Sequence, residues 1–197
     1  MGSNKKEAKT MNVRDFVVLC YGAFDGKING KTNLQKKVYF LAASLGKVEE
    51  LGYRAHYYGP YSAAVAEANS ELKSLNYLSE CSTSWGSDNR GFEIARYDFS
   101  LTDEGRRLLD RKRAKNPDIW EDLCDLAKKI KEAGNLDYWD LSIAAKAYFI
   151  LDKKEKSASS REIQDAAKDL GWEVKKEELD RASTFLEKIN LIKSLAA

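Results

Sequence analysis

The chain has 197 residues, of which 43% are hydrophobic and 32% are charged, and its formal net charge is +2. That length allows one large domain or two small ones, with enough chain to bury a substantial core. The near-neutral charge excludes a protein that binds nucleic acid through its overall electrostatics, although residues 1–50 hold nine Lys/Arg against five Asp/Glu.

Cysteine usage and hydropathy indicate the cellular compartment. Cys20, Cys81 and Cys124 are an odd number with no paired spacing, so we expect reduced thiols in a cytoplasmic protein. No apolar run approaches the about 18 residues of a membrane-spanning helix, and no membrane association is expected. Residues 1–11 contain no apolar stretch and predict a disordered N-terminal tail.

Two helices are predicted near the start of the chain. In residues 12–24 apolar side chains recur at helical spacing, and the turn-rich sequence DGKINGKT ends that helix. Residues 31–46 predict the second helix, which has a buried apolar stripe. The polar side of its first turns is expected to carry Lys31, Lys36 and Lys37.

The stretch HYYGPYS (56–62) follows and is unusually rich in rings. Alternation over residues 53–58 predicts a short strand. Gly59-Pro60 breaks that strand, because proline lacks a backbone donor. Ser62 can then cap a third helix, SAAVAEANSELKSLNYL. Core packing is the favoured interpretation of the rings around the turn, and an aromatic ligand-binding box is the alternative.

The third helix would be the recognition helix of a helix-turn-helix unit. We expect Asn69, Ser70 and Lys73 to face outward, where they could contact bases or phosphates. Glu67 and Glu71 also lie on the polar side of this helix and would oppose a phosphate backbone.

A β-hairpin with a long tip, SWGSDNRG, is predicted over residues 78–101. Trp85 lies among small polar residues and should be exposed, where it either marks a partner or folds over its own hairpin. Thr102 or Ser100 then caps a helix, TDEGRRLLDRKRAK, whose acidic start and basic end suit the helix dipole. The basic candidates of this region are Arg90, Arg96, Arg106, Arg107 and Arg111.

Helix, helix, short strand, helix, hairpin and helix is the order of a winged helix-turn-helix unit, which we assign to residues 12–115. Asn116-Pro117 marks a boundary, with Asn as cap and Pro at the first helical position. Three further helical segments follow, one of them opened by the capping box of Ser159 and Glu162, and LIKSL could add a final strand. The expected fold is therefore mostly α with short β-hairpins, in tandem winged helix-turn-helix-like lobes, with the second lobe over residues 116–197.

Two motifs resemble a known family. The residues Lys31, Leu34, Gln35 and Lys36, followed by YGPYS (58–62), resemble the pattern of the YwgA-like winged-helix proteins, whose function is largely uncharacterised. The resemblance implies a winged-helix fold over most of the chain and little about activity. A more distant similarity to the Panacea domain of phage-associated antitoxins implies an antitoxin-like partner, although Tyr61 and Lys37 depart from that pattern.

Catalytic and metal-binding constellations are missing from the sequence. His56 is the single histidine, so no histidine pair can bind zinc. Cys20 lies on a buried helical stripe, where a thiol behaves as a small hydrophobe rather than as half of a Cys–His dyad. DGKINGKT lacks the spacing of a phosphate-binding P-loop. We therefore expect no enzyme, no cofactor and no metal.

Two functions remain. The leading hypothesis is a non-enzymatic DNA-binding or regulatory protein that binds double-stranded DNA through its basic side chains. The competing hypothesis is a protein-binding adaptor or antitoxin-like partner, whose partner is another protein or a second copy of the chain, with Trp85, Tyr58 and Tyr61 as contacts. DNA binding requires the basic residues to converge on one face, whereas their scatter over several faces favours the adaptor.

Overall fold

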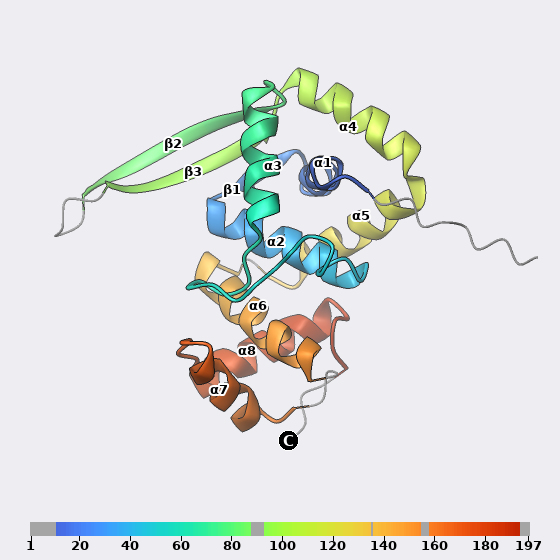
Figure 1. Cartoon of the computed structure of the whole chain (residues 1–197). Coiled ribbons are helices and arrows are strands. Elements are labelled where there is room, and N and C mark those ends of the chain that lie inside the picture. Colours follow the sequence, from blue (N-terminus) through green and yellow to red (C-terminus); the bar gives the residue numbers. More distant parts are fainter. Residues whose placement is uncertain (1–10, 88–92, 135, 155–157, 194–197) are drawn as a thin grey trace, which may run out of the picture.

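The computed structural model describes residues 11–87, 93–134, 136–154 and 158–193 (Figure 1). Most of the predicted N-terminal tail, and Arg90 in the hairpin tip, lie outside these ranges. The elements are α1 (Val13–Ala23), β1 (Lys27–Asn29), α2 (Lys31–Ser44), α3 (Ala63–Ser74), β2 (Leu78–Ser87), β3 (Glu93–Leu101), α4 (Asp103–Lys115), α5 (Pro117–Glu132), α6 (Tyr138–Lys153), α7 (Ser160–Asp169) and α8 (Lys176–Lys188).

The three strands form one antiparallel sheet in the order β1-β3-β2. Ile28 of β1 lies opposite Phe99 of β3, and Leu78 of β2 lies opposite Leu101, so that buried side chains fix the register. The β2–β3 hairpin, called the wing below, projects from the body of the protein (Figure 1). The element order α1-β1-α2-α3-β2-β3 is that of a winged helix, and the predicted fold, mostly helical with short hairpins, is confirmed.

The first strand is not where the sequence pattern placed it. Residues 53–58 contain no strand: they are irregular, with a turn at residues 57–58 and one isolated bridge between Arg54 and Tyr61. The strand is instead Lys27–Asn29, inside a segment that we expected to be a turn. Gly26 and Gly30, both at positive φ, turn the chain on either side of three extended residues, and burial of Ile28 against the sheet stabilises them.

Buried side chains run continuously from the first lobe into the second. Helix α6 is buried along residues 141–151 and packs against α2 on one side and against α7 and α8 on the other (Figure 1). Helix α5 packs against α1, α2 and α4, although it follows the boundary expected at Asn116. The described part of the second lobe after α5 contains three helices and no strand. Residues 191–193, the described part of LIKSL, are not in a strand.

Candidate binding site at the wing groove

A groove with a volume of about 760 Å³ opens beneath the wing, where α2 and α6 begin. We call it the wing groove. It receives residues from β1, α2, the loop before α3, the wing and α6, so that both lobes contribute to it. Its lining consists of Asn29, Gly30, Lys31, Thr32, Asn33, Tyr58, Trp85, Ala95, Arg96, Tyr97, Asp137 and Tyr138.

Exposed aromatic rings are the first distinctive property of the groove. Trp85 is 59% exposed, Tyr138 54% and Tyr58 46%. The ring of Tyr57 packs edge-on against Tyr58, with 4.9 Å between centroids, and extends the aromatic surface outward. Burying such rings against a partner is favourable, so this surface is suited to binding.

Positive charge is the second distinctive property. Lys31 Nζ lies 3.9 Å from the centroid of the Tyr97 ring. The Arg96 guanidinium lies 5.7 Å from the Trp85 ring, and its Nε is 3.0 Å from Asp98 Oδ1. Helix α2 begins here with no side-chain cap and no acidic residue in its first turn, so its positive dipole end is uncompensated.

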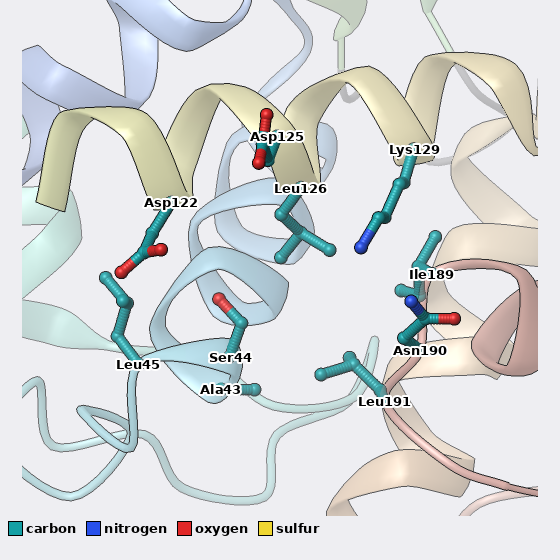
Figure 2. Close-up of a pocket in the computed structure, with 10 residues that line it drawn as sticks. All are labelled: Ala43, Ser44, Leu45, Asp122, Asp125, Leu126, Lys129, Ile189, Asn190 and Leu191. Atoms are coloured by element: carbon teal, nitrogen blue, oxygen red, sulfur yellow. The ribbon is translucent and has the colours of Figure 1, made fainter. Parts of the chain in front are cut away.

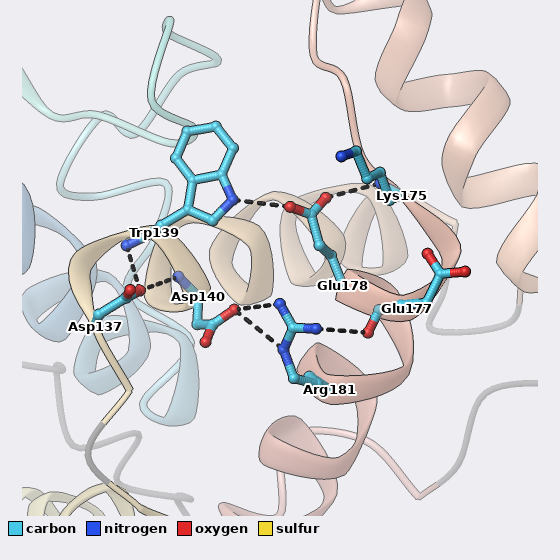
Figure 3. A network of polar contacts seen from close by, with 7 residues as sticks. All are labelled: Asp137, Trp139, Asp140, Lys175, Glu177, Glu178 and Arg181. Atoms are coloured by element: carbon cyan, nitrogen blue, oxygen red, sulfur yellow. Dashed lines mark hydrogen bonds and ion pairs between the residues drawn. The ribbon is translucent and has the colours of Figure 1, made fainter.

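The groove also contains one carboxylate, and that group is engaged within the protein. Asp137 caps α6, and its Oδ1 accepts hydrogen bonds from the backbone N–H groups of Trp139 at 2.9 Å and Asp140 at 2.8 Å (Figure 3). These bonds satisfy backbone N–H groups in the first turn of α6. The positive charges of the groove, Lys31 and Arg96, lie at its other end, beside the start of α2.

The two motifs that carry the family resemblance bind each other. Gln35 Nε2 donates to the carbonyl of Ser62 and Gln35 Oε1 accepts from its N–H, both at 3.0 Å. Lys36 Nζ donates to the carbonyl of Pro60 at 2.8 Å, and the Tyr53 hydroxyl donates to the carbonyl of Gln35 at 3.0 Å. These bonds fix the loop before α3 on α2, and that loop carries Tyr58 to the groove.

Lys36 is buried, which corrects the expectation that it faces solvent. It is 2% exposed and lies beneath Gly59, close to Lys146 of α6. Burial, helped by the charge of Lys146, lowers the pKa of Lys36 to about 7. A side chain enclosed between α2, α6 and the loop cannot reach a phosphate on the surface.

Contacts from the second lobe hold the same loop and the start of α6. Trp172 is buried and its indole Nε1 donates to the carbonyl of His56 at 2.7 Å. Figure 3 shows how Trp139 Nε1 donates to Glu178 Oε1 at 2.9 Å, while Arg181 pairs with Asp140 at 2.9 Å. These bonds join α6 to α8 and thereby position Tyr138.

Helix α3 offers less to a ligand than its sequence suggested. Asn69 is buried and its Oδ1 accepts a hydrogen bond from the Tyr21 hydroxyl at 2.7 Å, so the expectation that it reads bases is corrected. Lys73 is exposed but paired with Glu80 at 3.1 Å. Ser70 is exposed, and its hydroxyl donates to the carbonyl of Ala66. The local sequence around Asn69 could not predict this burial, because its partner Tyr21 lies 48 residues earlier in the chain.

The remaining predicted contacts lie elsewhere. Lys37 is half-buried with its Nζ 4.5 Å from the Phe24 ring centroid, and the Tyr61 ring lies against His56. Arg106, Arg107 and Arg111 are exposed on α4, which extends away from the wing (Figure 1). The structure therefore brings together Lys31, Arg96, Tyr58 and Trp85 from the predicted set.

Sequence reasoning missed two rings of the groove, Tyr97 and Tyr138. The periodicity of β3 could have placed Tyr97 on the face opposite Arg96, but only the pairing with β1 brings it beside Lys31. No local pattern distinguishes Tyr138, because its place in the groove depends on how α6 packs against α2.

A second hollow, of about 360 Å³, lies between α2, α5 and the end of α8 (Figure 2). Asp122, Asp125 and Lys129 of α5 line it together with Asn190 and short apolar side chains. Its charges are of both signs, and no aromatic ring lines it. The wing groove is therefore the stronger candidate for a binding site.

The described ranges contain no cluster of three or more His, Cys, Asp or Glu that could hold a metal ion. Within the same ranges, no helix has the length and apolar character needed to cross a membrane. No family model and no curated protein matches the chain.

Proposed function

We propose that this protein is a non-enzymatic DNA-binding or regulatory protein that contacts nucleic acid at the wing groove. The observation that carries the proposal is the position of Lys31 and Arg96, which lie together beside the wing of a winged helix and are both exposed. Winged helices commonly use the wing to contact the DNA backbone, and cationic side chains supply most of the affinity for phosphates.

The uncapped start of α2 adds to this site. Backbone N–H groups of a first helical turn point toward solvent and favour an anion. Lys31 is the first residue of that helix, and its ammonium lies over the Tyr97 ring, so its charge adds to that of the helix dipole at this end of the groove. The site requires no catalytic group, which agrees with a binding role.

The test is fluorescence anisotropy with labelled random duplex DNA, titrated at about 50 and 200 mM salt. Binding led by phosphates should weaken by orders of magnitude over that range. The double variant Lys31→Gln/Arg96→Gln should bind much more weakly and stay folded, because both side chains are exposed. Lys128→Gln, at an exposed position of α5, is the control. Absence of binding at low salt, both to this duplex and to a single strand of equal length, would refute the proposal.

A protein-binding adaptor is the second candidate. The exposed Trp85 favours it, and so does the division of the predicted basic residues between the wing groove and α4. Tryptophan, tyrosine and arginine dominate the energetics of protein interfaces, and the wing groove displays all three. In this case the partner is another protein, antitoxin-like or a second copy of the chain. Sedimentation analysis of the wild type and Trp85→Ala checks the second copy: a dimer that dissociates in the variant supports the adaptor.

A further inference from the structure

We propose that the wing groove binds single-stranded nucleic acid, with an unpaired base stacked on its exposed rings and the adjoining phosphate held at the start of α2. This inference rests on the proposed function and specifies the form of nucleic acid that the site takes. The groove offers two kinds of contact a short distance apart, an aromatic side and a cationic side.

The aromatic side suits unpaired bases. Trp85, Tyr58 and Tyr138 approach the groove from three separate segments and leave about half of each side chain open to solvent. Every base has a π-face that can stack on such a ring, whatever its sequence. In a duplex those faces are already covered by neighbouring base pairs, so a duplex cannot use this part of the site.

The cationic side suits the phosphate of the same nucleotide. Lys31 and Arg96 each lie over a ring, at 3.9 Å from Tyr97 and 5.7 Å from Trp85. Charge and ring are therefore neighbours, as they are along a strand in which each phosphate adjoins a base. The only carboxylate that lines the described groove, Asp137, is occupied in capping α6. Asp98, which does not line the groove, pairs with Arg96 Nε at 3.0 Å, so the phosphate shares Arg96 with that carboxylate.

The shape of the groove favours a strand over a free nucleotide. It is an open hollow of about 760 Å³, and the aromatic surface continues past it through Tyr57, which is 74% exposed. A ligand that extends beyond the groove can use that additional ring, which does not itself line the groove.

The decisive experiment compares three probes on the same protein: a labelled oligodeoxythymidine of about 15 nucleotides, a duplex of equal length, and thymidine monophosphate as competitor. The strand should bind more tightly than the duplex. Trp85→Ala should weaken strand binding by about 5- to 100-fold and duplex binding by less, because the duplex loses only the contact of Trp85 with Arg96. Trp85→Phe, which keeps an aromatic ring, should retain the affinity for the single-stranded oligonucleotide. Leu75→Ala, an equally exposed position on the far end of α3, is the control.

The outcomes separate this inference from the proposed function. If the duplex binds at least as tightly as the strand and Trp85→Ala changes neither, the inference is wrong and the proposed function stands. A monophosphate that displaces the strand at equal concentration would show that the groove takes free nucleotides, which also refutes it. If neither nucleic acid binds at about 50 mM salt, both proposals fail.

Discussion

Gly59 shows how a single residue sets the position of the loop that reaches the wing groove. Its φ is +93°, and a Cβ there would lie 3.0 Å from Lys146 Cγ and 3.3 Å from the carbonyl oxygen of Ser142. The loop can approach α6 this closely only because the residue has no side chain.

Replacing Gly59 by Ala should therefore destabilise the protein. Gly52 is the matched control, since its φ is +64° and nothing lies within 4 Å of a Cβ built on it. We expect Gly52→Ala to cost about 1 kcal/mol of unfolding free energy from backbone strain alone. Gly59→Ala should cost about 1–3 kcal/mol more than Gly52→Ala, because the added Cβ would press against α6. Urea denaturation measures both, and equal losses would show that the contact with α6 is not tight.

The buried lysine predicts how stability changes with pH. Because the pKa of Lys36 is lowered to about 7, the folded protein binds fewer protons than the unfolded chain between that pH and the ordinary lysine value of 10.5. The free energy of unfolding should therefore rise with pH above about 7, by up to about 1.4 kcal/mol per pH unit. Below about 7 the cost of burying the charge is fully present.

The measurement is denaturant unfolding between about pH 6.5 and 8.5, because at higher pH the Cys20 thiol acts in the opposite direction. Burial raises the pKa of that thiol, so the unfolded chain ionises first and stability falls. Lys36→Met keeps the length of the side chain without the charge and should flatten the rise. If the free energy of unfolding of Lys36→Met rises with pH at the same slope as in the wild type, the pH dependence comes from another group.

At the scale of the element, the pairing of α2 with the loop before α3 depends on one amide. Gln35 satisfies both the N–H and the carbonyl of Ser62, which are buried. Gln35→Leu would leave the Ser62 N–H unpaired and remove one of the two hydrogen bonds to the Ser62 carbonyl, which also accepts from the Ala66 N–H at 3.2 Å. The change should cost about 1–3 kcal/mol of unfolding free energy. Gln164→Leu is the control, because Gln164 makes one bond, to the carbonyl of Val174, at a half-buried site. Comparable losses in the two variants would contradict the pairing.

Helix N-termini were the most predictable features, because capping chemistry is local, whereas α3 ends at Ser74, before the predicted end at Leu78. Ser62 and Thr102 cap α3 and α4 through their hydroxyls, and Ser159 with Glu162 forms the expected capping box of α7. The three-residue strand β1 was not predictable in the same way. Its extended geometry comes from pairing with β3, which lies about 70 residues later in the chain.

The candidate site was predictable only where the position of a side chain depends on its neighbours in the sequence. Exposure of Trp85 follows from its small polar neighbours. Lys31 is exposed at the first residue of α2, and Arg96 is exposed within β3. Lys36 and Asn69 were misplaced, because partners remote in sequence, Pro60 and Tyr21, bury and satisfy them. Hydrophobic periodicity counts polar residues as exposed and contains no information about such partners.

Across the whole molecule, the basic side chains are divided between separate surfaces. Lys31 and Arg96 line the wing groove, whereas Arg107 and Arg111 lie on α4, which extends away from the wing (Figure 1). Exposed charges separated by more than about 8 Å are largely screened at physiological salt. The basic residues of α4, although densely spaced, should therefore add little to the affinity for nucleic acid that is bound in the wing groove.

This division predicts a difference between two variants that each remove two positive charges. Lys31→Gln/Arg96→Gln should reduce the slope of log K against log salt by about 0.9 for each lost phosphate contact on duplex DNA, whereas Arg107→Gln/Arg111→Gln should leave that slope nearly unchanged. Anisotropy titrations at four or more salt concentrations give both slopes. Because the two variants have the same net charge, a general electrostatic attraction would lower both slopes equally. A larger effect from the α4 variant would move the DNA-binding surface from the wing groove to α4, and with it the orientation of the whole protein on DNA.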